Sequence, residues 1–177
     1  MKVAEKYLPA GLLLAVLILS AFGLTKYESS EFSSPTIQIG VVVKNLEASV
    51  KFYTEVIGMK KTGGFSIDKD FGKRLGLTDT KAVEVSVLQL EDRESATQWK
   101  LMSFNQEASH PKQSYIHDDT GVQYITIYVK SLAPVMERLK KHNIKLLGET
   151  PLLLPDGKMF VLVQDPDGIF VELIGPK

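Results

Sequence analysis

The chain has 177 residues, of which 44% are hydrophobic, and its 21 Lys and Arg residues balance 21 Asp and Glu residues. This length and apolar content suffice for the core of one globular domain, and the balanced charge excludes a strong field that would attract nucleic acid. We therefore expect a small-molecule partner. The sequence has no Cys, which excludes disulfides, thiolate metal ligands and a cysteine nucleophile.

Residues 7–25 contain no charged side chain. As a helix they would extend about 28 Å, close to the ~30 Å hydrocarbon core of a membrane. We assign residues 1–26 to a hydrophobic helix that is either a signal peptide, with Ala21-Phe22-Gly23 as its cleavage site, or an uncleaved membrane anchor. In both cases the domain is expected to be exported or membrane-anchored, preferably outside the cytoplasmic membrane.

The polar, Ser-rich stretch 27–35 is expected to be a linker to a domain that begins at Thr36. The β-branched run that follows predicts a strand over 37–43. Asn45 is a typical helix N-cap, and apolar residues at helical spacing continue from it to Gly58, which is expected to end the helix. Gly63-Gly64 predicts a turn.

The same order of elements recurs in the second half. Val43, Asn45 and Leu46 correspond to Val129, Ser131 and Leu132, each offset by 86 residues, so Ser131 is expected to cap a second helix. Further strands are predicted at 82–90, 98–104, 124–129, 158–164 and 169–174. Asp165-Pro166-Asp167-Gly168 predicts a hairpin turn between the last two. The pattern indicates an internal duplication of a β-rich unit.

Two segments, N-L-E-A-S-V-K-F-Y-T-E-V-I-G-M at 45–59 and D-P-D-G-I-F-V-E-L at 165–173, resemble the signatures of the vicinal-oxygen-chelate superfamily of glyoxalase, bleomycin-resistance and dioxygenase-like domains. The resemblance covers residues 36–176 and implies an α+β fold. Two βαβββ modules would wrap eight strands into an open cup, with the helices outside and a ligand in the concavity between the modules. Module one would span 36–105, a connection 106–120, and module two 121–176.

Members of this superfamily exchange modules between subunits. The resemblance therefore leaves open whether one chain builds the cup or a homodimer does.

Alternation along each strand predicts which side chains line the cup, because only one face of a strand can pack under the helices. We expect the row from Ile37 to Val43 to be packed, together with Trp99 and Leu101. The predicted ligand-binding residues lie on the opposite faces: Gln38, Lys100, Met102, Phe104, Tyr124, Thr126, Tyr128, Phe170 and Glu172.

The resemblance implies that metal-dependent members hold their metal at the positions of Gln38, Lys100, Tyr124 and Glu172. Lys100 is cationic and has no acceptor atom, and Tyr124 would ligate only as phenolate, so we expect no cofactor and no catalytic metal. We expect Lys100 to pair with Glu172, either to close the emptied site or to bind an anionic ligand group. His110, His117 and His142 are expected at the solvated surface.

Three functions stay open, and no catalytic residue is assigned. The first is metal-free binding of a small, partly aromatic or amphiphilic molecule. The second is a lyase or isomerase of the lactoylglutathione-lyase type that uses Gln38 and Glu172, with a weak divalent metal disfavoured and dioxygenase chemistry disfavoured further. The third is a membrane-anchored interaction module with a vestigial cup.

Overall fold

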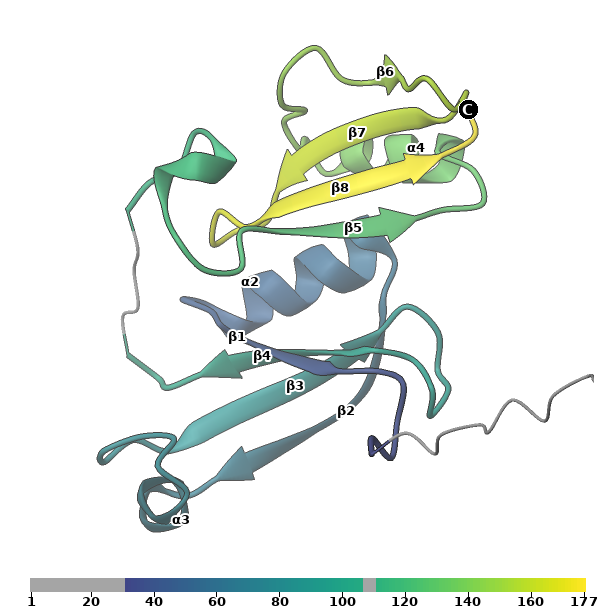
Figure 1. The fold of residues 1–177 in the computed structure, drawn as a ribbon. Coiled ribbons are helices and arrows are strands. Elements are labelled where there is room, and N and C mark those ends of the chain that lie inside the picture. Colours follow the sequence, from purple (N-terminus) through teal and green to yellow (C-terminus); the bar gives the residue numbers. More distant parts are fainter. Residues whose placement is uncertain (1–30, 107–110) are drawn as a thin grey trace, which may run out of the picture. The chain divides into compact units, whose positions relative to one another are not determined.

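The computed structural model describes residues 31–106 and 111–177, and Ser34–Lys177 form one compact unit (Figure 1). The hydrophobic segment predicted at 7–25 lies outside the described residues. Among the helices that are described, none has the length and apolar character needed to span a membrane.

The first module contains two helical segments between its first two strands and a short helix before its third strand. Its elements are β1 (Gln38–Val42), α2 (Leu46–Lys51), the π-helix η1 (Phe52–Ile57), β2 (Lys60–Ile67), α3 (Lys69–Arg74), β3 (Val83–Gln89) and β4 (Gln98–Ser103).

The second module repeats this order after a 3-10 turn in the connection. Its elements are η2 (Ile116–Asp118), β5 (Tyr124–Tyr128), α4 (Ala133–Lys141), β6 (Leu152–Leu153), β7 (Met159–Gln164) and β8 (Phe170–Gly175).

Each module forms one four-stranded sheet, with strand orders β1-β4-β3-β2 and β5-β8-β7-β6. In both sheets the first and last strands of the module pair in parallel, and the other pairs are antiparallel. The predicted α+β fold class is confirmed, because both halves fold as βαβββ and each forms one four-stranded sheet.

The first helix begins and ends as its sequence predicts. The Asn45 side chain accepts a hydrogen bond from the Ala48 amide at 2.9 Å, and Gly58 ends the helix with a φ of 97°. The second half of this helix is a π-helix, which the apolar spacing did not reveal. At the second helix, Ser131 lies one residue earlier than the N-cap Leu132, and its hydroxyl accepts from the Ala133 amide at 3.3 Å.

Two local predictions in the first module are wrong. Gly63 and Gly64 form no turn but lie inside β2, which pairs with β3 and has a bulge between Lys61 and Gly63. Ile37 does not belong to the packed row, because it precedes β1 and is 70% exposed, whereas Val43 is buried.

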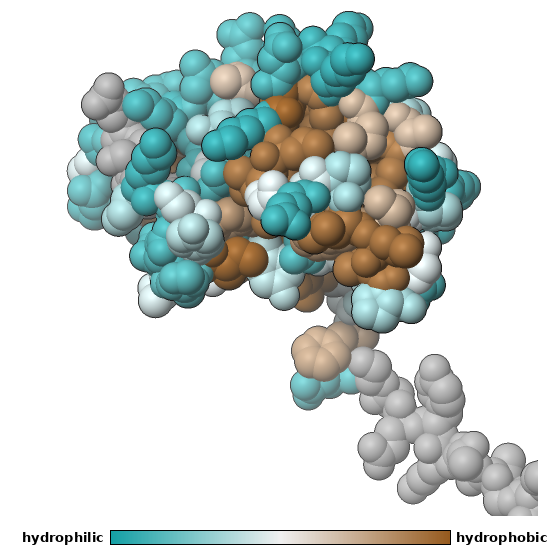
Figure 2. All heavy atoms as spheres, turned by 90° about the horizontal axis from the view of Figure 1, so that it is seen from above, coloured by the Kyte–Doolittle hydropathy of each residue, from teal (hydrophilic) through white to brown (hydrophobic). Residues whose placement is uncertain are grey.

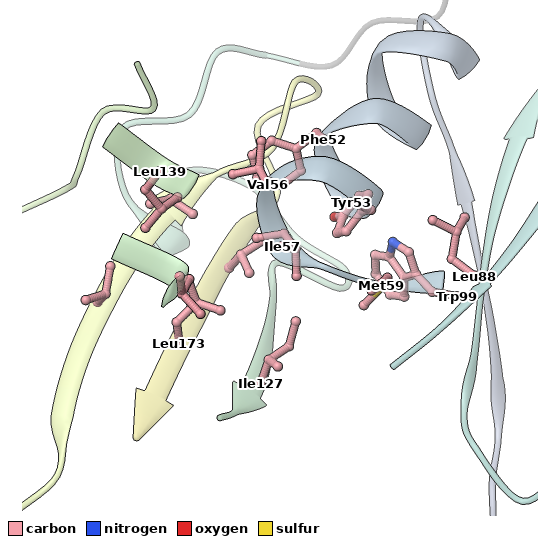
Figure 3. Packing of buried hydrophobic residues seen from close by; sticks show 14 of the residues in the cluster. Phe52, Tyr53, Val56, Ile57, Met59, Leu88, Trp99, Ile127, Leu139 and Leu173 are labelled. Carbon is pink, nitrogen blue, oxygen red and sulfur yellow. The ribbon is translucent and has the colours of Figure 1, made fainter. Parts of the chain in front are cut away.

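A single hydrophobic core joins the modules, and the helix formed by α2 and η1 lies between the two sheets (Figure 3). On one side Tyr53 and Met59 point toward Trp99 of the first sheet, where Trp99 and Leu101 are buried as predicted. On the other side Ile57 points toward the second sheet, whose Ile127 and Leu173 are also buried. The core-facing sides of the two sheets thus face each other across the helix. Their opposite faces therefore point away from each other.

Candidate functional site

Wall one is the face of the first sheet that points away from the core. Strand register places Val42 beside Met102, Met102 beside Val85, and Val85 beside Phe65 on this face. A second hydrophobic cluster forms here, with Val83, Val85 and Val87 buried and Ile67, Met102 and Phe104 packed against them. Wall one is therefore an ordered apolar surface, in which the predicted ligand-binding residues Met102 and Phe104 take part.

The polar spot of wall one consists of Lys100 and Gln38. The Lys100 ammonium donates a hydrogen bond to Gln38 Oε1 and lies 5.7 Å from the centroid of the Phe65 ring. Within residues 31–106 and 111–177, Lys100 belongs to no ion pair. Within the described residues, the half-buried ammonium of Lys100 thus has a neutral amide and no carboxylate as its hydrogen-bond partner.

Wall two is the corresponding face of the second sheet. The predicted residues Tyr124, Thr126 and Tyr128 lie on it, and Tyr128 is 70% exposed. Glu172 stands at its centre and accepts a hydrogen bond of 2.5 Å from the Thr126 hydroxyl. Ile174 lies on this face, as alternation along the last strand predicts, and the register adds three apolar side chains that were not predicted to line the cup: Leu152, Phe160 and Leu162. Figure 2 views the molecule from the side of the second sheet and shows hydrophobic side chains gathered around a few polar ones.

The connection closes one end of wall two. Gln164, the register partner of Phe170, donates from its amide to the backbone carbonyl of Gln113 at 3.2 Å. Gln113 is itself buried, and Phe170 is only 2% exposed. Phe170 therefore packs beneath the surface of wall two and cannot contact a ligand there, whereas Tyr124 and Tyr128 are exposed.

The structure does not form the predicted ion pair between Lys100 and Glu172. Lys100 binds Gln38 within the first sheet and Glu172 binds Thr126 within the second, because the two walls are directed to opposite sides of the shared core. Of the four positions that the resemblance assigns to a metal, only those on the same sheet are therefore brought together within one chain.

These four positions do not fit a divalent cation. Lys100 brings a positive charge, and Gln38 Oε1, the one acceptor beside it, already accepts from that ammonium. Within the part of the chain that the structure describes, no three His, Cys, Asp or Glu side chains cluster as a metal site would require. His117 is exposed and stacks on Tyr115, His142 is half-buried at the end of α4, and His110 lies outside the described residues.

A buried polar network that the sequence did not reveal holds the β7–β8 hairpin against the first helix. Tyr53 donates from its hydroxyl to Asp165 at 2.9 Å, and Ser49 donates to Asp167 at 2.9 Å. Burial raises the pKa of Asp165, and burial together with the Asp165 charge raises the pKa of Tyr53 well above its usual value. The spacing of the D-P-D-G motif shows only the turn, so its partners on a distant helix could not be read from it.

A surface hollow of about 680 Å³ lies beside this network, between the start of α2 and the end of β4. The carboxylate of Asp167, which lines the hollow, already accepts hydrogen bonds from the Lys44 amide and from Ser49. This carboxylate thus serves the packing of the two modules, and the walls are the better candidates for a ligand site.

The family model described as Glyoxalase/Bleomycin resistance protein/Dioxygenase superfamily matches residues 37–173, most of the chain and both modules. The chain belongs to this superfamily. An uncharacterized protein of Bacillus subtilis (strain 168), YwbC, is 27% identical over 134 residues, covering 75% of this chain and 90% of YwbC.

Solved structures of the glyoxalase superfamily share the fold. A glyoxalase family protein from Bacillus cereus has a TM-score of 0.67 at 19% identity, covering 84% of this chain and 97% of its own. The trypanothione-dependent glyoxalase I of Leishmania major has a TM-score of 0.58 at 23% identity, covering 81% of this chain and 87% of its own. At these identities the likeness establishes the fold of the superfamily and not the activity of this member.

Proposed function

We propose that this chain binds a small apolar or amphiphilic molecule on the walls of its cup, and that it does so without a catalytic metal. Both walls combine aromatic and aliphatic side chains with a few polar groups, which is the usual composition of a small-molecule site. The exposed rings of Phe65, Tyr124 and Tyr128 supply flat apolar surface for such a ligand.

One observation carries the metal-free part of the proposal. The Lys100 ammonium occupies a position that the resemblance assigns to a metal ligand, and it takes the acceptor oxygen of Gln38, which is a second such position. A divalent cation placed there would meet a fixed positive charge and would have to break this hydrogen bond. The polar spot is therefore suited to a ligand that accepts hydrogen bonds.

We propose further that a second copy of the chain completes the cup. Within one chain the walls face away from each other, and each leaves apolar side chains in solvent, with Val42 of wall one 50% exposed and Leu152 of wall two 46% exposed. Wall two of a partner would cover this apolar surface of wall one with apolar surface of its own.

Metal analysis of the full-length protein, prepared without chelator, tests the metal-free part. We expect bound zinc, nickel, iron and manganese to be well below one ion per chain. The double variant K100E/Y124H, which supplies a carboxylate and an imidazole at two of the implied ligand positions, is expected to gain affinity for nickel or zinc in a calorimetric titration. Stoichiometric metal on the unmodified protein would instead favour the lyase or isomerase function.

A thermal-shift screen of small aromatic and aliphatic compounds tests the binding part. A ligand that binds the folded state is expected to raise the melting temperature. The variant V42D, which places a charge on the apolar surface of wall one, should lose this response. K141D, on the far end of α4, should keep it. A response that is equal in the unmodified protein and V42D would place the ligand elsewhere.

A further inference from the structure

We infer that the ligand of wall one is an amphipathic organic acid whose carboxylate lies against Lys100 and Gln38. The inference rests on the proposed function, because it names the chemical class of molecule that the wall would hold.

The first argument is the hydrogen-bonding character of the polar spot. The Lys100 ammonium has three N–H donors and no acceptor, and one donor is used by Gln38 Oε1. In the described residues the Gln38 amide nitrogen has no acceptor, so it contributes further donors. A carboxylate has only acceptor oxygens and forms strong, charge-assisted bonds with such donors. A neutral amide or alcohol would match this donor-only spot less well.

The second argument is charge. Lys100 is half-buried and forms no ion pair with any described Asp or Glu. The Phe65 ring lies beside the ammonium, and the buried side chain of Val87 is the register neighbour of Lys100. An anion brought to this place interacts with the ammonium more strongly than it would in bulk water.

The third argument is the shape of the remaining surface. Val42, Phe65 and Met102 extend from the polar spot as apolar surface, and Gly40 carries no side chain, which leaves its place to the Met102 sulfur. An apolar body attached to the carboxylate can pack on this surface.

Methionine methyl groups offer a direct measurement. Met102 lies on wall one, whereas Met136 of α4 packs against the core and serves as an internal control. On the full-length protein labelled with ¹³C-methyl methionine, we would titrate 2-naphthoate and octanoate and, separately, their neutral carboxamides. The acids are expected to shift the Met102 resonance at concentrations about tenfold lower than the amides, and to leave Met136 in place.

Charge variants separate the acid site from general apolar binding. K100Q should abolish the preference for acid over amide, and K100R should retain it. The matched control is K61Q, because Lys61 lies on β2 opposite the core residue Leu88 and therefore on the other face of the same sheet. K61Q is expected to bind like the unmodified protein.

Each outcome decides between the two proposals. If acids and amides shift Met102 at equal concentrations, the acid class is wrong while binding on wall one holds. If neither shifts Met102 but other resonances move, or if nothing moves, then binding on wall one fails together with the acid class. Retention of the acid preference in K100Q would also overturn the inference.

Discussion

Asp165 is a buried carboxylate at the contact between the hairpin and the first helix. Its oxygens accept hydrogen bonds from the Tyr53 hydroxyl and from the Asp167 and Ile169 amides, yet burial raises its pKa. In the unfolded chain an Asp titrates near a pKa of about 4, so above that pH the folded state retains a proton that the unfolded state has lost. This residue therefore makes the protein less stable as pH rises through the raised pKa.

The variant D165N removes this titration while its amide keeps an acceptor oxygen for the two backbone N–H groups. We expect the free energy of unfolding of D165N, relative to the unmodified protein, to increase as pH is raised from about 4 to 7. Urea denaturation at several pH values measures this difference. D92N, which changes an exposed carboxylate of the β3–β4 loop, is the control. A difference that stays constant over this range would contradict the assigned pKa direction.

Arg138 of α4 ties the second module to the end of the first helix. Its guanidinium donates to the Val56 carbonyl at 2.8 Å and to the Ile57 carbonyl at 2.9 Å. Both acceptors are terminal carbonyls of η1, which lack partners inside the helix. The sequence shows only a basic residue on an amphipathic helix. This contact depends on packing between segments 81 and 82 residues apart.

We expect R138M to lower the free energy of unfolding by about 2 kcal/mol, because two charge-assisted hydrogen bonds to partly buried carbonyls are lost. K140M, on the exposed side of the same helix, should change it by less than about 0.5 kcal/mol. The midpoint of urea unfolding measures the change in stability of both variants. Equal effects of the two variants would show that the guanidinium contributes nothing specific.

Among the elements, those with strong alternation or a cap were predictable. The strands β3 and β4 carry alternating apolar residues, β7 and β8 are short apolar runs, and Asn45 and Gly58 mark a helix with local chemistry. Strand β2 was missed because Gly63-Gly64 reads locally as a turn, whereas pairing with β3 holds both glycines extended. Phe65 of wall one was missed with it. On β7 every residue before Gln164 is apolar, so the sequence does not separate the wall residues Phe160 and Leu162 from their neighbours, and only pairing with β8 places them on wall two.

The paired glycines of β2 offer a matched test of this pairing. A Cβ on Gly64 would lie 2.8 Å from the Val85 carbonyl oxygen, whereas nothing lies within 4 Å of a Cβ on Gly63. We expect G64A to destabilise the protein by roughly 1–3 kcal/mol, since the two strands must move apart. G63A should be neutral or slightly stabilising because alanine loses less backbone entropy. Thermal and urea unfolding compare the two variants. Similar losses for both would contradict the strand register.

At the scale of the whole molecule, the sequence predicts which face of a strand a side chain occupies better than it predicts how the two modules pack against each other. Gln38, Lys100, Thr126 and Glu172 all lie on the predicted faces. The sequence left open whether these residues converge within one chain or between two. They do not converge within one chain, because the packing of the two modules is decided by apolar residues such as Ile57 and Leu173 in the shared core. Alternation assigns a side chain to one face of its strand, but it does not show which faces of the two sheets pack against each other.

The outward direction of the walls leads to a prediction about assembly. If wall one of each copy faces wall two of the other, the contact is closed and gives a symmetric dimer with two cups. Light scattering of the full-length protein should then report a dimer. V42D on wall one and Y128D on wall two should each shift it toward monomer, because a carboxylate would be buried without a partner.

Mixing these two variants distinguishes a wall-to-wall dimer from any other association. A heterodimer of V42D and Y128D has one unmodified cup, formed by wall one of the Y128D copy and wall two of the V42D copy. The mixture of V42D and Y128D is therefore expected to form dimers that neither variant forms alone. The double variant V42D/Y128D should remain monomeric, because both of its walls carry the substitution. K140D, on the outer side of α4, should leave the dimer intact. Recovery would show that each cup takes one wall from each copy, while a dimer that survives both single substitutions would require a contact away from the walls.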